Sequence, residues 1–426
     1  MIFSVYYLAA LILAAGDLRG RLAAWTIRLP ALDAWAWCAV LLCTYAAQLF
    51  IILDAAQKTP WPIPIVAPAP GDFVTASTIA LGAIQVLALA GLYRARIGAP
   101  VIATGGAMLL LSWSAPVFLN ADIYAYVGNG LLGAAAYAPP NAPFAGDLAF
   151  INARWGTPVP PATYGPLWLT IAHLVVTLAP TLAGKLFAFR ALSLALFVAL
   201  IALLRACGLP PRILALAALN PGLQLQFVVD AHNDILPVVL VVGAAALVRK
   251  LPYAACGLIV VAALVKLPYA LAGLPVLAAM LPASRRYAAC ALVVVASAAL
   301  SWFGGGAAYA RALIGYAASS HLAGILHGIA ALAALAAIAA AVMGARRLRA
   351  AVWLMPMLGA YTASWYAMWS LPYALQRRRI ALYFFLWFPL VSVLAEPSLA
   401  TPWTMFVLVP IVVALSLRYS LQPRPS

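Results

Sequence analysis

The stretch PRILALAALNPGLQLQFVVDAHNDILPVVLVVGAAALVRK, residues 211–250, contains the pattern that decides the fold of the whole chain. Two apolar runs, 211–229 and 234–249, are separated by a short polar segment, and the second run ends in two basic residues. A helix of about 20 apolar residues crosses the hydrocarbon core of a bilayer. Because backbone polar groups cannot stay unpaired in lipid, such runs predict membrane-spanning helices.

The composition agrees with this interpretation. Of the 426 residues, 67% are hydrophobic and only 8% are charged, whereas a soluble domain has about 25% charged residues. A transmembrane β-barrel would need short segments of alternating hydrophobicity, which the sequence lacks. We therefore expect an all-α polytopic membrane protein, a single integral domain over 1–426 with about 13–14 transmembrane helices.

The expected spans are the apolar runs between basic or turn-forming segments. The N-terminal run lacks the positive start of a signal peptide, so we interpret it as a first span. The apolar stretch 164–181 either crosses the membrane or lies in its interface. The other runs cover 2–16, 34–53, 74–93, 98–115, 184–205, 211–229, 234–249, 252–266, 267–282, 287–303, 323–343, 350–369, 380–395 and 400–418.

The net charge of +16 comes from basic residues gathered in short clusters between the apolar runs. Such clusters are typical of cytoplasmic loops under the positive-inside rule. Anionic membrane lipid is therefore a better partner for them than nucleic acid. The clusters lie at 19–28, 94–96, 249–250, 285–286, 346–349 and 377–379.

Two polar interruptions divide the chain, a long loop at 116–163 and a shorter one at 304–322. The basic cluster at 94–96 should lie inside, so the next span carries the long loop to the outer face. If 164–181 lies in the interface or re-enters, the following basic clusters fall inside. Residues 230–234 then emerge outside, facing the long loop, and we favour this arrangement because it satisfies more charges.

Acidic residues beside apolar segments are the first candidates for chemistry. The chain has only nine, and Asp122, Asp230 and Asp234 lie next to or within apolar runs. An acid at mid-membrane costs about 2.5–3.5 kcal/mol and usually faces a functional cavity. On a continuous helix Asp230 and Asp234 would share a face. The alternatives are helix capping and a site for a hard divalent cation, although the spacing matches no strong ligand pattern.

Other polar and aromatic residues have ordinary explanations when each is taken alone. Aromatic side chains near helix ends often form the interfacial belt, and Lys266 could extend to the lipid headgroups. If Lys266 is buried, it needs an anionic partner, which a lipid phosphate could supply.

The order of five short segments resembles one family. They are D-x-Y-x-Y at 122–126, TYGPLWL at 163–169, NPGLQLQFVVDAHND at 220–234, LVKLPYALAGLP at 264–275 and SWYAMWSLP at 364–372. In this order they resemble the polyprenyl-phosphate-mannose-dependent α-1,6-mannosyltransferases of the GT-C superfamily. The resemblance covers about 118–375, most of the chain.

The resemblance implies an inverting hexosyltransferase in the cytoplasmic membrane, with its active site facing outside. The acceptor hydroxyl of a glycan or lipid-linked acceptor would attack a polyprenyl-phosphate-linked mannose. It implies no cofactor, and a divalent metal remains an alternative. Asp122 would be the catalytic base and Arg190 and Lys266 would bind phosphate. Contacts to the sugar or the lipid would come from Tyr124, Tyr126, Tyr164, His232, Asn233, Asp234, Trp365, Tyr366 and Trp369.

Two other functions remain open from the sequence. An ion-coupled transporter or lipid-linked-sugar flippase would also use acidic and histidine side chains within the membrane, but such proteins are often built from similar halves, and none are visible here. A GT-C enzyme for arabinose, glucose or aminoarabinose is a nearer alternative, because nothing in the sequence fixes the sugar.

The topology gives a first test. A reporter fused after Leu209 should behave as cytoplasmic, because the interfacial arrangement of 164–181 places the basic residues that follow it inside. Alkaline phosphatase and fluorescent-protein fusions at this position measure the side directly. An extracytoplasmic signal would show that 164–181 crosses the membrane.

Overall fold

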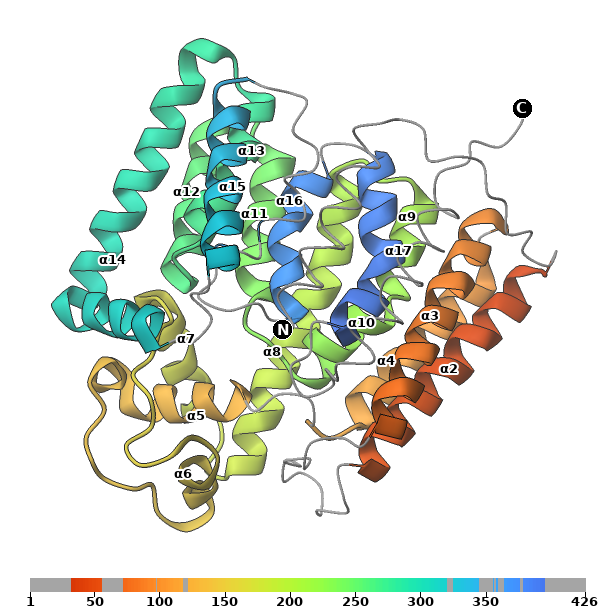
Figure 1. Ribbon diagram of the computed structural model, residues 1–426, viewed down its shortest axis with the longest axis horizontal. Helices are drawn as coiled ribbons and strands as arrows, with labels where there is room; N and C mark the ends of the chain where they lie inside the picture. Colours follow the sequence, from red (N-terminus) through yellow and green to blue (C-terminus); the bar gives the residue numbers. More distant parts are fainter. Residues whose placement is uncertain are drawn as a thin grey trace.

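Figure 1 shows a computed structural model of the chain, in which helices pack side by side. The expected spans at 2–16 and 400–418 lie outside the described residues. Among the residues that are described, secondary structure is helical and no strand is present. The structure describes residues 32–55, 72–96, 98–117, 122–319, 325–344, 355, 358, 364–375 and 378–394.

The helices follow the apolar runs closely, so the all-α polytopic class is confirmed. Their bounds are α2 (Ala34–Ala55), α3 (Asp72–Arg94), α4 (Ala99–Ser114), α5 (Asp122–Leu132), η1 (Gly133–Tyr137), η2 (Gly146–Leu148), α6 (Ala149–Trp155), α7 (Pro166–Thr177), α8 (Leu182–Ala206), α9 (Pro211–Ala218), α10 (Pro221–Gln224), η3 (Leu225–Val229), α11 (Ile235–Leu247), α12 (Pro252–Val265), α13 (Tyr269–Met280), α14 (Ala283–Ser319), α15 (Ile325–Val342), η5 (Ser364–Ser370), α16 (Leu371–Ala374) and α17 (Arg378–Leu394).

Length and apolar composition identify the helices that could cross a membrane. Within the described residues, 4 qualify, in α2, α3, α8 and α14, and a pair bent by 47°, Pro211–Ala218 with Pro221–Val229, would bring the number to 5. The expected 13–14 spans also included shorter apolar helices such as α11 and α12. Helix α7 has 12 residues, a length of about 18 Å, and is one of these shorter apolar helices.

A continuous apolar core holds the bundle together. It joins α2, α3 and α17 at one side of the molecule to α8 and to α11–α13 in the middle. A second cluster of buried apolar residues lies where α5 packs against α7 and α8, around Tyr126, Trp168 and Phe189. The functional residues described below lie along the boundary between these two clusters.

The segment 116–163, expected as a long loop between spans, contains the short helices α5, η1, η2 and α6. Helix α5 begins at Asp122, and its buried residues include Ile123, Tyr126, Val127 and Gly130. These positions have the i, i+3, i+4, i+7 spacing of one helix face. Apolar periodicity over 11 residues was therefore present in the sequence, although prolines and asparagines after it favoured a loop.

The second polar interruption, 304–322, was expected to be a loop, but its described part, 304–319, is helical. Helix α14 continues to Ser319, and only Gly306 leaves the helical conformation, with φ 59° and ψ −159°. Glycine adopts positive φ without the Cβ penalty of other residues. The interruption is therefore a sharp bend (Figure 1), after which residues 307–319 run in a new direction; we call this part the α14 arm.

The polar segment 230–234 is a break between two helices. Residues Leu225–Val229 form the π-helix η3, and Ala231 then has a positive φ of 53°. Helix α11 restarts at Ile235. A continuous helix would bring the Pro237 ring against the carbonyl of residue 233, whereas proline is tolerated in the first turn of a new helix. The expectation that Asp230 and Asp234 share a helix face is therefore wrong.

Polar side chains hold the segment before this break. The Asn220 carboxamide accepts a hydrogen bond from the Leu223 amide at 3.2 Å and donates to the Phe385 carbonyl in α17 at 2.7 Å. One turn later, Gln224 accepts from Ser112 of α4 at 2.8 Å. The chain entering the break is thus fixed to two distant helices.

Gly165, which precedes α7, provides a test of how tightly the start of α7 packs against the end of α12. Its amide donates to the Val265 carbonyl at 2.9 Å, and a Cβ at this position would lie 2.1 Å from the Leu264 carbonyl oxygen. Since overpacking costs about 1–3 kcal/mol, Gly165→Ala should lower the melting temperature of the purified protein. The matched control is Gly257→Ala in α12, where a Cβ meets no atom within 4 Å. Equal melting temperatures for the two variants would contradict this packing.

Candidate active site

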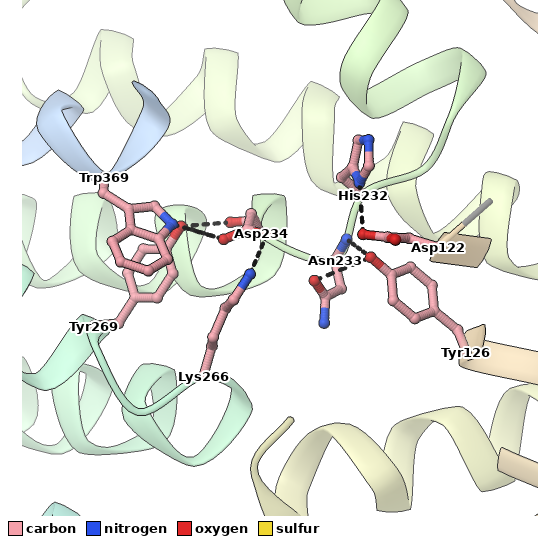
Figure 2. Close-up of polar contacts among 8 residues, drawn as sticks. All are labelled: Asp122, Tyr126, His232, Asn233, Asp234, Lys266, Tyr269 and Trp369. Carbon is pink, nitrogen blue, oxygen red and sulfur yellow. Dashed lines mark hydrogen bonds and ion pairs between the residues drawn. The ribbon is translucent and has the colours of Figure 1, made fainter. Parts of the chain in front are cut away.

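The break at 230–234 directs three consecutive side chains toward different partners (Figure 2). His232, Asn233 and Asp234 are all buried. A helix would have spread them by 100° steps around one axis, but here the irregular backbone aims each at a separate element. The three polar side chains are thus buried close together in the sequence but face different elements, and this geometry comes from the break.

Asp234 is the most heavily bonded of the three. Its Oδ2 accepts from Lys266 Nζ at 2.8 Å, and its Oδ1 accepts from Trp369 Nε1 at 2.7 Å and from Tyr269 OH at 3.1 Å. Its side chain does not cap α11, which argues against the capping explanation. The carboxylate instead joins the start of α11 to the α12–α13 junction and to η5.

Lys266 lies at the end of α12, where its ammonium group is nearly buried. Besides the ion pair to Asp234, it faces aromatic rings: Nζ lies 4.3 Å from the ring centre of Tyr366, 5.5 Å from that of Trp369 and 5.9 Å from that of Tyr164. Cation–π contacts of this kind stabilise a desolvated ammonium group by roughly 0.5–2 kcal/mol. The ammonium group is thus held in place and is not extended to the headgroups.

Asn233 pairs with Tyr126 of α5. The Tyr126 hydroxyl donates to Asn233 Oδ1 at 3.2 Å and accepts from the Asn233 amide N–H at 3.2 Å. The Tyr126 ring packs edge-on against Tyr164 and Trp168. Tyr126 and Asn233, both predicted to contact the sugar, hydrogen-bond to each other and anchor α5 to the break.

His232 lies beside Asp122, the first residue of α5. Their separation is 3.6 Å between Nδ1 of the imidazole and Oδ2 of the carboxylate. The opposite side of the imidazole is stacked on Trp365, with ring centres 3.7 Å apart and planes inclined by 16°. Two residues 110 positions apart in the sequence are thus neighbours, as the expected convergence of the two polar segments requires.

Asp122 also lines an open pocket. Asp122 and Lys266 both line it, and they are the charged residues among the described side chains of its lining. Residues between Ile151 and Tyr164, with Trp155 and two prolines among them, form one wall. Tyr366 and Tyr316, the latter from the α14 arm, also line it. The pocket therefore combines an acid and a cation in one hollow of mainly apolar and aromatic character.

Arg190 has a different position from the one predicted. Its Nη2 donates to the carbonyls of Ser112 at 2.7 Å and Trp113 at 2.9 Å, and its Nε donates to that of Val228 at 3.4 Å. The side chain is buried and does not line the pocket. Arg190 thus connects the end of α4 to η3, a structural arrangement. Tyr124 is also fully buried, packed 5.3 Å from Phe150 between ring centres, and lies outside the pocket lining.

A row of tyrosines connects the α14 arm to the pocket. Tyr309 packs on Tyr137 with ring centres 5.0 Å apart, and the Tyr137 hydroxyl donates to the Tyr164 carbonyl at 3.1 Å. Burial raises the pKa of the Tyr137 phenol well above its ordinary value, so it remains a neutral donor. The arm therefore supports the residue whose ring faces Lys266.

The sequence did not single out several residues of the site. Tyr269 lies three positions after Lys266, but the chain between them is not helical, since α12 ends at Val265 and α13 begins at Tyr269, so no helical spacing signalled their shared partner. Asn129, Trp155 and Tyr316 line the pocket, yet no spacing in the sequence connects them. Within the described residues, no group of three or more His, Cys, Asp or Glu side chains is placed to hold a metal ion.

The all-α fold is consistent with a membrane glycosyltransferase of the GT-C type. A family model described as alpha-(1->6)-mannopyranosyltransferase, N-terminal domain, matches residues 36–283. This match covers more than half of the chain, so the protein belongs to that family, as the five ordered segments indicated. Searches of curated proteins and of solved structures found no match.

The ion pair between Asp234 and Lys266 can be tested by removing its charges. Removing one charge leaves the other buried and uncompensated, at a cost of about 3–5 kcal/mol, so Asp234→Asn and Lys266→Gln should each lower the melting temperature strongly. The double variant removes both charges but keeps groups that can hydrogen-bond to each other. It should be more stable than the sum of the single losses predicts. Strict additivity of the two shifts would show that the pair does not interact.

Proposed function

We propose that the protein transfers a mannosyl residue from a polyprenyl-phosphate donor to a hydroxyl of a glycan or lipid-linked acceptor, with inversion, at the outer face of the cytoplasmic membrane. The observation that carries the proposal is the presence of Asp122 and Lys266 in the same pocket. Membership of a mannosyltransferase family supports the reaction class.

Asp122 has the properties of a general base. Its side chain is partly accessible from the pocket, with 11% of its surface exposed, and it is the acid among the residues that line the pocket. A carboxylate within hydrogen-bond reach of the acceptor hydroxyl takes its proton as the new glycosidic bond forms. Direct attack on the anomeric carbon inverts its configuration.

Lys266 has the properties of a phosphate ligand. As the bond from the anomeric carbon to the donor oxygen breaks, the electron pair leaves with the lipid phosphate, and a fixed cation stabilises the developing charge. Asp234 holds the ammonium group in position, and the aromatic rings around it exclude water. This makes Lys266 the phosphate-binding residue of the proposal, in preference to Arg190, whose donors are used by backbone carbonyls.

The sugar would lie between these two groups. Tyr164 and Tyr366 line the pocket beside Lys266, and aromatic rings are suitable surfaces for the apolar faces of a sugar. Trp369 lies behind them, bonded to Asp234. In this arrangement Asp234, Trp369, Asn233 and Tyr126 shape the pocket from behind and do not touch the donor.

A transporter or flippase is the alternative of another class. It would need its acidic groups to relay ions or protons, whereas Asp234 is committed to three protein donors. Purified protein in vesicles should move mannose from lipid phosphate to acceptor without a proton gradient. Uptake that depends on a gradient, in the absence of transfer, would favour the transporter.

Asp122→Asn should reduce transfer by about 100- to 10,000-fold, the usual contribution of a general base. The assay measures labelled mannose moved from polyprenyl phosphate to acceptor by purified protein. The matched control is Asp147→Asn: this acid is in the same segment, but it accepts from the Leu182 amide at 2.8 Å and does not line the pocket. Near-normal turnover of Asp122→Asn would exclude it as the base.

Donor recognition is tested best in the charge-free double variant Asp234→Asn with Lys266→Gln, which lacks the cation but leaves no buried charge. It should raise the donor KM at least about tenfold, since a lost charged hydrogen bond costs about 1.5–3 kcal/mol. The exposed Lys250→Gln serves as control. An unchanged donor KM would remove Lys266 from phosphate binding. A panel of lipid-linked sugars in the same assay identifies the sugar.

A further inference from the structure

His232 is a buried titratable residue that has no role in the proposed function. Its side chain is 0% exposed, and it does not line the pocket. The sequence predicted that it contacts the donor, but Asp122 reaches the pocket and His232 does not. His232 can therefore act only on the protein groups that surround it.

Burying the two nitrogen atoms of the imidazole costs free energy. Among the described residues neither ring nitrogen has a partner within hydrogen-bond distance. A buried polar group left unsatisfied costs roughly 1–3 kcal/mol. Phenylalanine or leucine would fill the same space without this cost, so the presence of an imidazole indicates a use for at least one nitrogen.

The surroundings fix the direction in which the imidazole points. Its face is stacked on Trp365, and the His232 amide donates to the Gln226 carbonyl at 3.1 Å. The next two residues are anchored by Tyr126 and by Lys266. With both the ring plane and the backbone held, Nδ1 faces Asp122 Oδ2 at 3.6 Å (Figure 2).

We propose that His232 is the positioning residue of Asp122: its Nδ1–H donates to Oδ2 and thereby turns the other carboxylate oxygen toward the acceptor hydroxyl. The distance of 3.6 Å is slightly longer than an ordinary hydrogen bond. Hydrogen bonds in catalytic sites are often long without substrate and shorten in the reactive complex. This inference rests on the proposed function, in which Asp122 is the base.

The proton balance follows from this arrangement. The acceptor hydroxyl gives its proton to the other carboxylate oxygen of Asp122 while its own oxygen bonds to the anomeric carbon. The bond from that carbon to the donor phosphate breaks, and its electron pair leaves with the phosphate. His232 keeps its Nδ1 proton throughout, so it acts only by holding Asp122 and touches neither substrate.

Two isosteric substitutions separate the ring nitrogens. The amide nitrogen of Asn can take the place of Nδ1, whereas that of Gln reaches the place of Nε2. His232→Asn should therefore retain kcat within about tenfold of the wild type. His232→Gln should lose about 100-fold in kcat, because a misplaced reacting group costs about this much. The donor KM should stay within about twofold in both variants.

The same measurements can overturn the proposal. If His232→Gln is as active as His232→Asn or more so, Nδ1 does not act on Asp122. A raised donor KM with unchanged kcat would make His232 a substrate contact. Because both variants keep a polar group of similar volume, equal melting temperatures will show that folding is not the cause; a His232→Phe variant, expected to lose as much kcat as His232→Gln, provides a third comparison.

A further readout uses Asp122→Asn as background. Since His232 is proposed to act through Asp122, adding His232→Gln should not reduce the residual transfer further. A multiplicative loss would mean that the two residues act independently. If the wild-type protein transfers no lipid-phosphate-linked sugar, the proposed function itself fails. If transfer depends on Asp122 but every His232 variant keeps full kcat, only the present inference fails.

Discussion

The ion pair between Asp234 and Lys266 is the interaction on which the geometry of the pocket depends. Desolvating two charges costs several kcal/mol each, and the pair persists because Tyr269 and Trp369 also donate to the carboxylate and aromatic rings face the ammonium group. Three segments far apart in the sequence meet at this single carboxylate. A pocket cation held in this way needs no rearrangement when an anionic ligand arrives.

In the break beside this ion pair, neighbouring side chains contact different parts of the protein. His232 faces Asp122, Asn233 bonds to Tyr126 of α5, and Asp234 bonds to Lys266. A regular helix would point these three side chains in other directions, fixed at 100° steps around its axis. The left-handed conformation of Ala231, strained for a residue with a side chain, is therefore part of how the site is built.

The sequence predicted the helices and the presence of a polar site better than the contacts within it. Apolar runs determine where helices form, so the positions of α2, α3 and α8 could be foreseen. The partner of Asp234 depends on how distant helices pack, and no local spacing encodes it. Arg190 illustrates the difference: a basic residue in an apolar run suggested a ligand for phosphate, but its actual partners are backbone carbonyls, which every sequence contains. Helix α5 was not predicted because the prolines that follow it indicated a loop, although its own residues have helical periodicity.

The two walls of the pocket have different structural origins. Residues 151–164 form one of them, whereas Lys266 and Tyr366 belong to the buried ion-pair region on the other. Amino-acid changes in the first wall would reshape the space available to a substrate while leaving the fixed cation untouched. Natural selection could in this way change which molecules the pocket admits while its buried charges stay in place.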